Sequence, residues 1–556
     1  MASIALRLRT GANHFFRRPG YRQAMLARMP AFAVLTALCA GLVSLLLAWA
    51  TGGLSPSLIN PDEGAHYVNS LFIGDWIRAG FPSPMAYAQT YYAHFPRLSI
   101  GHWPPGWYLV QSPVFALLRP SPLGALAISA VVAALPAGAI AWTFDRMGRR
   151  MLGLALALSY VALPLVSDSA RYILLDQPVA LAVALAAIAW MHASDAPQSR
   201  RFLLFALLAA AAVLIKGNGA LIALVPAIDI ALTGRWHLLR RPGLWIAAAV
   251  ALMLVAPWYW LSFRISAGGF NYEPGLAYAA LSLRANAAAL FGNLGPAGIT
   301  LALTGAVSAF RTTDVMETRI ARLSLAVIAS TLVFQAIVPA AIEPRYIAPM
   351  LPWMLVLIGI GLTALWRLRP VGRRLAVPAA MLAALPACLA LASLAPKPDI
   401  GAPALGREMA DTGGLWLVDG RAGGEGSLIA AAAYADRGAM RIWVGRASQW
   451  LSTSDFMGQD YRLAADTPDQ VQAILDRLGT SGVVSAAERN ALAFPHSRLL
   501  REAVVSDGYA TSRRPFTRGN GTMMVARRIG RITPNPALIE RNTGSANVGR
   551  MSAALD

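Results

Sequence analysis

The stretch PAFAVLTALCAGLVSLLLAWA, residues 30–50, contains no charged side chain. About 20 apolar residues in a helix cross the roughly 30 Å hydrocarbon core of a bilayer, so this stretch predicts a transmembrane helix. It is too long for the apolar core of a signal peptide, and we therefore expect an uncleaved first span. Ten similar apolar runs follow at 122–144, 151–167, 175–192, 202–215, 217–233, 243–263, 286–309, 323–341, 347–366 and 374–395.

The composition of the whole chain also indicates a polytopic α-helical membrane protein. Of its 556 residues, 56% are hydrophobic and 14% are charged, whereas soluble domains carry about 25% charged residues. The net charge of +20 comes from arginines that cluster in short loops between apolar runs, as the positive-inside rule describes. This distribution argues against a nucleic-acid-binding surface. Cys39 and Cys388 lie far apart in apolar runs, so we expect no disulfide framework.

Charge also predicts the orientation of the spans. The run 107–118 has only about a dozen residues, which suits a juxtamembrane or re-entrant helix better than a crossing. If this run does not cross the membrane, the chain has eleven spans, and the basic N-terminus and most loop arginines lie in the cytoplasm. The loop 51–121 and the C-terminal region then lie outside. The unusual polar residues share this outer face: Asp168, Arg171, Asp176, Lys216, the loop 264–285 and the segment 343–346.

The chain divides into four regions by composition. We expect a cytoplasmic N-terminus (1–29), a transmembrane domain (30–396) with 51–121 as its first external loop, and a small periplasmic α/β domain (397–530). A polar tail (531–556) follows.

Local patterns predict the elements of the α/β domain. Pro468 suits the first position of a helix, so we expect a helix over 468–478 with Thr467 as its N-cap. The glycine-rich segment 420–426 departs from the dinucleotide-binding spacing and predicts a loop. The other expected elements are a helix at 427–434 and strands at 415–418, 441–444, 483–484, 503–505 and 523–525.

Two adjacent carboxylates, Asp62 and Glu63, follow the first span in the segment NPDEGAHY. Asn60 can cap a helix whose first residue is Pro61, and both carboxylates would then stabilise the helix N-terminus. An ionised carboxylate at the edge of a membrane is also well placed to act as a general base. The sequence leaves both roles open.

Asp176 and Arg171 each have a structural and a functional interpretation. Asp176 opens an apolar run, so it either caps a helix or faces Asp62 across a cavity. Arg171 either pairs with Asp168 or Asp176, or lies near a phosphate.

Two cations later in the chain have similar alternatives. Lys216, in a glycine-rich turn between spans, either extends to the membrane interface or places a point charge on a phosphate. Arg345 either pairs with Glu343 or binds an anion, and its planar guanidinium is the better phosphate ligand.

Three histidines of the outer loop, His66, His94 and His102, could bind a divalent metal together with the carboxylates. Their spacing matches no standard motif, and histidine is common at membrane interfaces. A divalent metal therefore stays open, and no other cofactor is expected.

The order of these motifs resembles that of the GT-C superfamily of membrane glycosyltransferases, and especially its bacterial protein-mannosyltransferase and aminoarabinose-transferase (family 39-like) branch. The matching pieces are 61–63, 103–108, 171–178, 216–217 and 345–346. Trp103 stands where the family usually has a lysine.

The resemblance implies a GT-C-like fold and transfer of a sugar, with inversion, from a polyprenyl-phosphate donor. The acceptor would be a hydroxyl of a glycolipid, polysaccharide or protein at the periplasmic face of a bacterial inner membrane. By this resemblance Asp62 is the expected base, and Glu63 or Asp176 orients the acceptor or the sugar. The expected substrate-binding residues are Arg171, Lys216, Arg345, Tyr346, His66, His102 and Tyr108.

Two other classes of protein have to be weighed against a transferase. A transporter or flippase usually has broken helices and charges near the middle of the membrane, whereas the notable charges here lie at the ends of the apolar runs. A non-catalytic assembly or sensor protein would use the membrane domain only to display the C-terminal domain.

Overall fold

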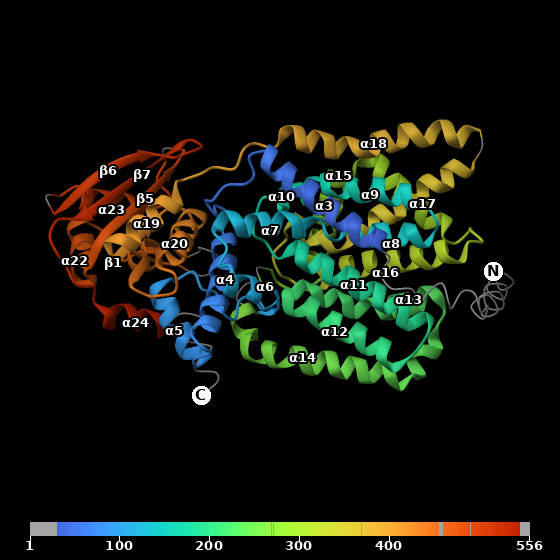
Figure 1. Cartoon of the computed structure of the whole chain (residues 1–556), viewed down its shortest axis with the longest axis horizontal. Helices are drawn as coiled ribbons and strands as arrows, with labels where there is room; N and C mark the ends of the chain where they lie inside the picture. Colours follow the sequence, from blue (N-terminus) through green and yellow to red (C-terminus); the bar gives the residue numbers. More distant parts are fainter. Residues whose placement is uncertain are drawn as a thin grey trace.

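A computed structural model of the chain describes residues 31–544, except for 268–269, 271, 369, 455–459, 490 and 507. The expected cytoplasmic segment 1–29 and the last part of the expected tail, 545–556, lie outside the described residues. A bundle of long helices lies beside a domain built on a β-sheet, with short helices of the first loop between them (Figure 1). These short helices are α4 (Glu63–Arg78), α5 (Pro84–His94) and α6 (Gly106–Leu117).

All eleven apolar runs form helices of the bundle. Eight helical segments among the described residues are long and apolar enough to cross a membrane, so the number of eleven spans stays a prediction. The bundle helices are α3 (Ala31–Ala50), α7 (Pro122–Ala134), α8 (Ala137–Arg146), α9 (Arg150–Ala162), α10 (Pro164–Ser169), α11 (Asp176–Asp195), α12 (Ser199–Ile215), η1 (Gly217–Ala223), α13 (Leu224–Thr233), η2 (Trp236–Arg240), α14 (Pro242–Ser266), α15 (Leu276–Ser308), α16 (Val315–Ile337), η4 (Pro344–Met350), α17 (Leu351–Arg367) and α18 (Val371–Ser393).

Prolines and glycines set the breaks in these helices. Pro136 separates α7 from α8, and α15 is kinked where Gly295, with a φ of 61°, precedes Pro296. The expected outer loop 264–285 is shorter than predicted, because α15 already begins at Leu276.

Glycines also allow a close helix contact in the bundle. A Cβ atom at Gly305 of α15 would lie 2.0 Å from the carbonyl oxygen of Leu357 in α17. A Cβ atom at Gly361 would lie 2.1 Å from the carbonyl oxygen of Leu301. Two backbones approach this closely only where both helices carry small residues, which is the usual basis of tight packing between membrane helices.

A layer of buried charge lies at the C-terminal end of α11. The guanidinium of Arg319, which is 1% exposed, donates from Nε to Asp195 Oδ1 at 2.8 Å and from Nη1 to Asp229 Oδ1 at 2.7 Å. Trp190 Nε1 donates to the other oxygen of Asp229 at 2.8 Å. Since α11 has 20 residues, this layer lies about 30 Å from the N-terminal end of the helix.

The α/β domain contains a five-stranded sheet in the order β2-β1-β5-β7-β6. The strands β2 (Ile442–Arg446), β1 (Gly414–Asp419) and β5 (Thr480–Glu488) are parallel, whereas β7 (Gly521–Arg528) and β6 (Tyr509–Pro515) are antiparallel. One face of the sheet packs against α22 (Pro468–Leu478) and α23 (Pro495–Val504). The other packs against α19 (Ala402–Thr412) and α20 (Ala422–Asp436). The smaller elements are α21 (Ala447–Trp450), β3 (Ser452–Thr453), β4 (Arg462–Leu463) and α24 (Pro536–Gly544).

The first external loop and the α/β domain share one hydrophobic core. Apolar side chains of α4 and α5 pack with those of α20 and of the adjacent face of the sheet. The approach of α4 to α20 is close, since a Cβ atom at Gly64 would lie 2.7 Å from the carbonyl oxygen of Gly426. The soluble domain is therefore packed against the segment that carries Asp62 and Glu63.

Most of the expected elements of the α/β domain are present, and Thr467 caps α22 by accepting a hydrogen bond from the amide of Gln470. Two expectations were wrong. The segment 503–505 is not a strand, because Ala503 and Val504 complete the apolar face of the amphipathic helix α23. The segment 420–426 is largely the first part of α20, where a Cβ atom at Gly423 would lie 1.7 Å from the carbonyl oxygen of Ile59. The expected polar tail contains α24, which packs against α5.

Candidate functional site

The segment that begins α4 is held by a reciprocal pair of hydrogen bonds. Asn60 Oδ1 accepts from the amide of Asp62 at 3.0 Å, and Glu63 Oε2 accepts from the amide of Asn60 at 2.9 Å. The pattern is similar to a capping box, but α4 begins at Glu63 with Asp62 at the capping position, so the helix starts two residues later than predicted. The side chain of Asp62 makes no cap hydrogen bond, which leaves its carboxylate free to face other side chains.

Four charged residues from four parts of the chain meet at this segment. Arg345 Nη2, in η4, donates to Asp62 Oδ2 at 2.8 Å, and Arg345 Nε lies 3.9 Å from Asp176 Oδ2. Lys216, at the end of α12, donates from Nζ to Asp176 Oδ1 at 2.6 Å. Asp176 is 1% exposed, whereas Asp62 is 26% exposed. Two carboxylates and two cations thus form a nearly neutral cluster that reaches the surface at Asp62.

Aromatic side chains surround this cluster. The Nζ atom of Lys216 lies 4.6 Å from the centre of the Tyr346 ring, a cation–π distance. The Nδ1 atom of His66 lies 2.8 Å from the hydroxyl of Tyr108, and the imidazole lies 4.5 Å from the Trp103 ring, centre to centre. The structure therefore brings together eight of the ten residues that the sequence suggested, counting His102, which contacts Trp103 edge-on at 4.6 Å.

Burial and neighbouring charges set the protonation states. Burial lowers the pKa of His66 to about 3, so this ring is neutral at pH 7. Burial also raises the pKa of the Tyr108 hydroxyl, which therefore keeps its proton. Burial alone would raise the pKa of Asp62, but His66, Arg345 and Lys216 together hold it below its ordinary value. Because His66 is neutral, Arg345 is the nearest cation that keeps Asp62 ionised at neutral pH.

Several buried polar atoms in this region have no hydrogen-bond partner among the described residues. They include Asp176 Oδ2, Arg345 Nε and both polar atoms of the Asn218 side chain. Buried polar atoms are nearly always hydrogen-bonded in folded proteins. Unsatisfied donors and acceptors beside a cluster of charges mark a candidate place for a polar ligand or an ordered water. The sequence did not single out Asn218, although its position two residues after Lys216 was a usable signal.

Glu63 points away from this cluster. Both of its oxygens bind Lys397, at 2.8 and 2.9 Å from Nζ, and Glu63 Oε1 also accepts from the amide of Ile173 at 3.1 Å. The contacts of Arg171 are likewise elsewhere, with the carbonyl of Ala395 and with Asp168. The sequence analysis missed Lys397, although it is one of only two lysines in the chain.

The proposed group of three histidines does not form. His94 Nδ1 lies 2.7 Å from the carbonyl oxygen of Ile442, and its ring stacks on Trp443 of β2. Among the described residues, no group of three or more histidine, cysteine, aspartate or glutamate side chains is placed to hold a metal ion.

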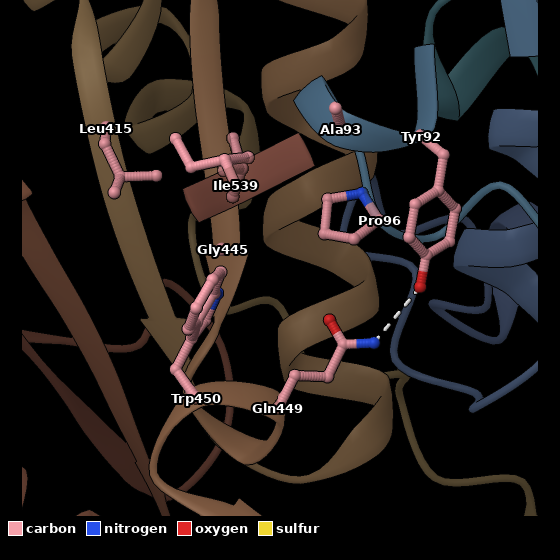
Figure 2. Close-up of a pocket in the computed structure, with 9 residues that line it drawn as sticks. Tyr92, Ala93, Pro96, Leu415, Gly445, Gln449, Trp450 and Ile539 are labelled. Carbon is pink, nitrogen blue, oxygen red and sulfur yellow. Dashed lines mark hydrogen bonds between the residues drawn. The ribbon is translucent and has the colours of Figure 1, made fainter. Parts of the chain in front are cut away.

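A small hollow lies elsewhere, between α5 and the edge of the sheet. Figure 2 shows Tyr92 hydrogen-bonded to Gln449 at its rim, with Trp450 and Ile539 on the opposite side. None of the charged residues described above lines this hollow. The charged cluster, and not the hollow, is the candidate site.

Comparison with known proteins places this geometry in a structural class. The chain superposes on ArnT from Cupriavidus metallidurans bound to undecaprenyl phosphate with a TM-score of 0.54 and 16% identity, over 89% of this chain and 98% of ArnT. The chain therefore has a GT-C-like fold. A second GT-C structure, the Archaeoglobus fulgidus oligosaccharyltransferase in complex with Zn and sulfate, matches with a TM-score of 0.50 and 14% identity, over 87% of this chain and 73% of that protein.

Sequence comparison agrees with this GT-C-like fold over part of the chain. Residues 102–260 match the family described as dolichyl-phosphate-mannose-protein mannosyltransferase. This range contains Asp176 and Lys216 but neither Asp62 nor Arg345. No sequence among the curated proteins matches the chain.

Proposed function

We propose that this protein is an integral membrane glycosyltransferase that moves a sugar from a polyprenyl-phosphate donor to an acceptor hydroxyl, with inversion. The observation that carries the proposal is the cluster of Asp62, Asp176, Lys216 and Arg345, with its unsatisfied polar atoms, in a GT-C-like fold. The structural relative ArnT is described as bound to undecaprenyl phosphate, which is the lipid that such a transfer would release.

The cluster supplies the groups that a direct displacement needs. Lys216 and Arg345 would bind the phosphate of the donor and stabilise the negative charge that develops on it as the bond to the sugar breaks. Asp62, ionised and partly exposed, would accept the proton of the acceptor hydroxyl as its oxygen bonds to the sugar carbon. The electron pair of the broken bond leaves on the phosphate, and attack from the opposite face inverts the configuration.

The other residues around the cluster would position the substrates. Asp176 holds Lys216 in place, and its free oxygen can accept a hydrogen bond from a sugar hydroxyl. Tyr346, His66, His102 and Tyr108 would form the walls of the site. Glu63 and Arg171 are not part of this proposal, because their side chains are occupied by other contacts.

We also propose that the reaction takes place at the periplasmic face of a bacterial inner membrane, with the N-terminus in the cytoplasm. Arg200 and Arg201, which follow the far end of α11, support this orientation, since loop arginines concentrate on the cytoplasmic side. The donor would then enter the site from the bilayer, and a glycolipid, polysaccharide or protein acceptor would approach from the aqueous side.

Replacement of the proposed base tests this function. A strain that lacks the protein should lack one sugar in its envelope glycans or lipids, and mass spectrometry of these fractions identifies it. We expect the wild-type protein to restore the sugar and the Asp62→Asn variant to fail. Asp168→Asn is a matched control, because Asp168 is a 57% exposed carboxylate near the same end of the bundle, and it should restore the sugar.

Two outcomes would contradict the proposal. If the Asp62→Asn variant restores the missing sugar fully, at the same protein level as wild type, Asp62 is not the base. A deletion strain in which no covalent product is missing, together with transport of a lipid-linked substrate in vesicles, would favour a flippase.

A further inference from the structure

Glu63 and Lys397 form an ion pair that is closed off from solvent. Both side chains are 0% exposed, and the two contacts from Lys397 Nζ measure 2.8 and 2.9 Å. The residues are 334 positions apart in the sequence. An unpaired charge at this depth would destabilise the protein strongly, so the two residues must be placed together for the chain to fold as it does.

The carboxylate of Glu63 joins three segments. Oε2 accepts from the amide of Asn60 at 2.9 Å, Oε1 accepts from the amide of Ile173 at 3.1 Å, and Lys397 binds both oxygens. Lys397 also donates to the carbonyl of Arg171 at 3.1 Å. Every strong acceptor position of Glu63 is therefore in use, which leaves it no capacity to contact a substrate.

Asp62 is fixed by the same contacts. Its amide donates to Asn60 Oδ1, and the amide of Asn60 donates to Glu63. The backbone on both sides of Asp62 is thus tied to Glu63, and through it to Lys397. A displacement of Glu63 would carry Asp62 with it, because the two residues are adjacent.

The α/β domain holds Lys397 from the other side. Lys397 lies in the connection between α18 and α19, and its amide donates to the carbonyl of Gly52 at 3.0 Å. Arg518, in the turn between β6 and β7, donates to the carbonyls of Lys397 at 2.7 Å and of Gly52 at 3.1 Å. A continuous chain of contacts runs from the sheet through Lys397 and Glu63 to Asp62.

We propose that Lys397 is a positioning residue for Asp62 and that it acts through Glu63. This inference rests on the proposed function, since it assumes that Asp62 is the base. It also gives the α/β domain a role in catalysis, because Arg518 anchors the segment that carries Lys397. The effect on rate follows from geometry: displacement of a catalytic group by about 1 Å can lower the rate roughly 100-fold.

The test compares a single and a double variant. Lys397→Met leaves the charge of Glu63 buried and unpaired, and this variant is at risk of misfolding. The double variant Glu63→Gln, Lys397→Met removes both charges and keeps similar volumes, so it should fold. Arg514→Met is the control, because it breaks a partly exposed ion pair with Glu408 in the α/β domain, away from Lys397.

The assay uses full-length protein in membranes and the lipid extract of the deletion strain, which should accumulate the unused donor. We expect the double variant to release undecaprenyl phosphate about 10–100-fold more slowly than wild type at saturating extract. The amount of extract needed for half-saturation and the stoichiometry of binding of added undecaprenyl phosphate should stay the same. Hydrogen exchange at the amides of Asn60 and Ile173 should become faster, whereas Arg514→Met should match wild type in every measurement.

The outcomes separate this inference from the proposed function. A wild-type rate in the double variant, with an active wild-type protein, would overturn the positioning role alone. Loss of undecaprenyl phosphate binding in a folded double variant would also overturn it, because the pair would then act on the donor and not on the base. A wild-type protein that releases nothing, at the same level as Asp62→Asn, would overturn the proposed function and the positioning role together.

Discussion

Replacement of Arg345 by glutamine should change both the rate and its dependence on pH. Arg345 contacts Asp62 at 2.8 Å through Nη2 and keeps Nε free beside Asp176. The variant therefore loses one of the two cations available for a phosphate and one charge-assisted hydrogen bond to the base. Loss of a single donor that stabilises developing negative charge lowers kcat about 10²–10³-fold, and we expect a loss of this size at saturating donor.

The change in pH dependence follows from the sign of the effect on Asp62. Arg345 helps to hold the pKa of Asp62 below its ordinary value, so the wild-type protein keeps an ionised base into the acid range. Without the guanidinium the pKa of Asp62 rises, and activity should begin to fall at a higher pH as the solution is acidified. Any contribution of this pair to stability follows the same sign: it is present at neutral pH and is lost as acid protonates Asp62.

The rate of polyprenyl phosphate release between pH 4 and pH 8, with extract from the deletion strain as donor, measures both effects. Arg421→Gln serves as the control, because Arg421 is 67% exposed in the α/β domain, and its profile should match wild type. If the Arg345→Gln variant is slower but its activity falls at the same acidic pH as in wild type, Arg345 does not control the pKa of Asp62. An unchanged rate would refute the role of Arg345 in binding the leaving group.

Three further predictions concern other parts of the molecule. Gly305→Ala should destabilise the bundle by about 1–3 kcal/mol, because its Cβ would overlap the backbone of α17. The control Gly292→Ala, in the same helix, places its Cβ near no other atom and should leave the thermal midpoint of unfolding in detergent equal or slightly higher. Asp229→Ala should lower stability by about 3–5 kcal/mol, since it leaves the buried guanidinium of Arg319 with one partner fewer; an unchanged midpoint would contradict this. Burial lowers the pKa of His66 to about 3, so His66→Gln should leave the shape of the pH–rate profile between pH 5 and pH 8 unchanged. If a change of rate with pH in this range disappears in the variant, His66 titrates there and the prediction is wrong.

The sequence predicts the helices better than it predicts their contacts. Apolar length alone locates every helical segment of the bundle except η2, because a membrane leaves few alternatives to a helix. In the soluble domain a short apolar segment is ambiguous, as 503–505 shows. Three consecutive apolar residues fit a strand, and only their spacing from Leu499 and Leu500 indicates the end of a helix.

The candidate site was predictable in part. Scarce charges at the ends of apolar runs pointed to Asp62, Asp176, Lys216 and Arg345, and the structure brings these four together. Their pairing was not predictable, because Arg345 had Glu343 as an equally good partner nearby. The contact between Glu63 and Lys397 spans most of the chain, and no local pattern indicates which distant lysine a carboxylate will meet.

The charges at the two ends of α11 have a consequence for the surrounding lipid. Asp176 is fixed to Lys216 at one end, and Asp195 is fixed to Arg319 at the other. A helix anchored at both ends can neither tilt freely nor slide to adapt to a thicker or thinner bilayer, which is how a single helix normally relieves hydrophobic mismatch. The lipid around α11 must therefore adapt to the protein, and the separation of the two charge pairs is set by the protein and not by the membrane.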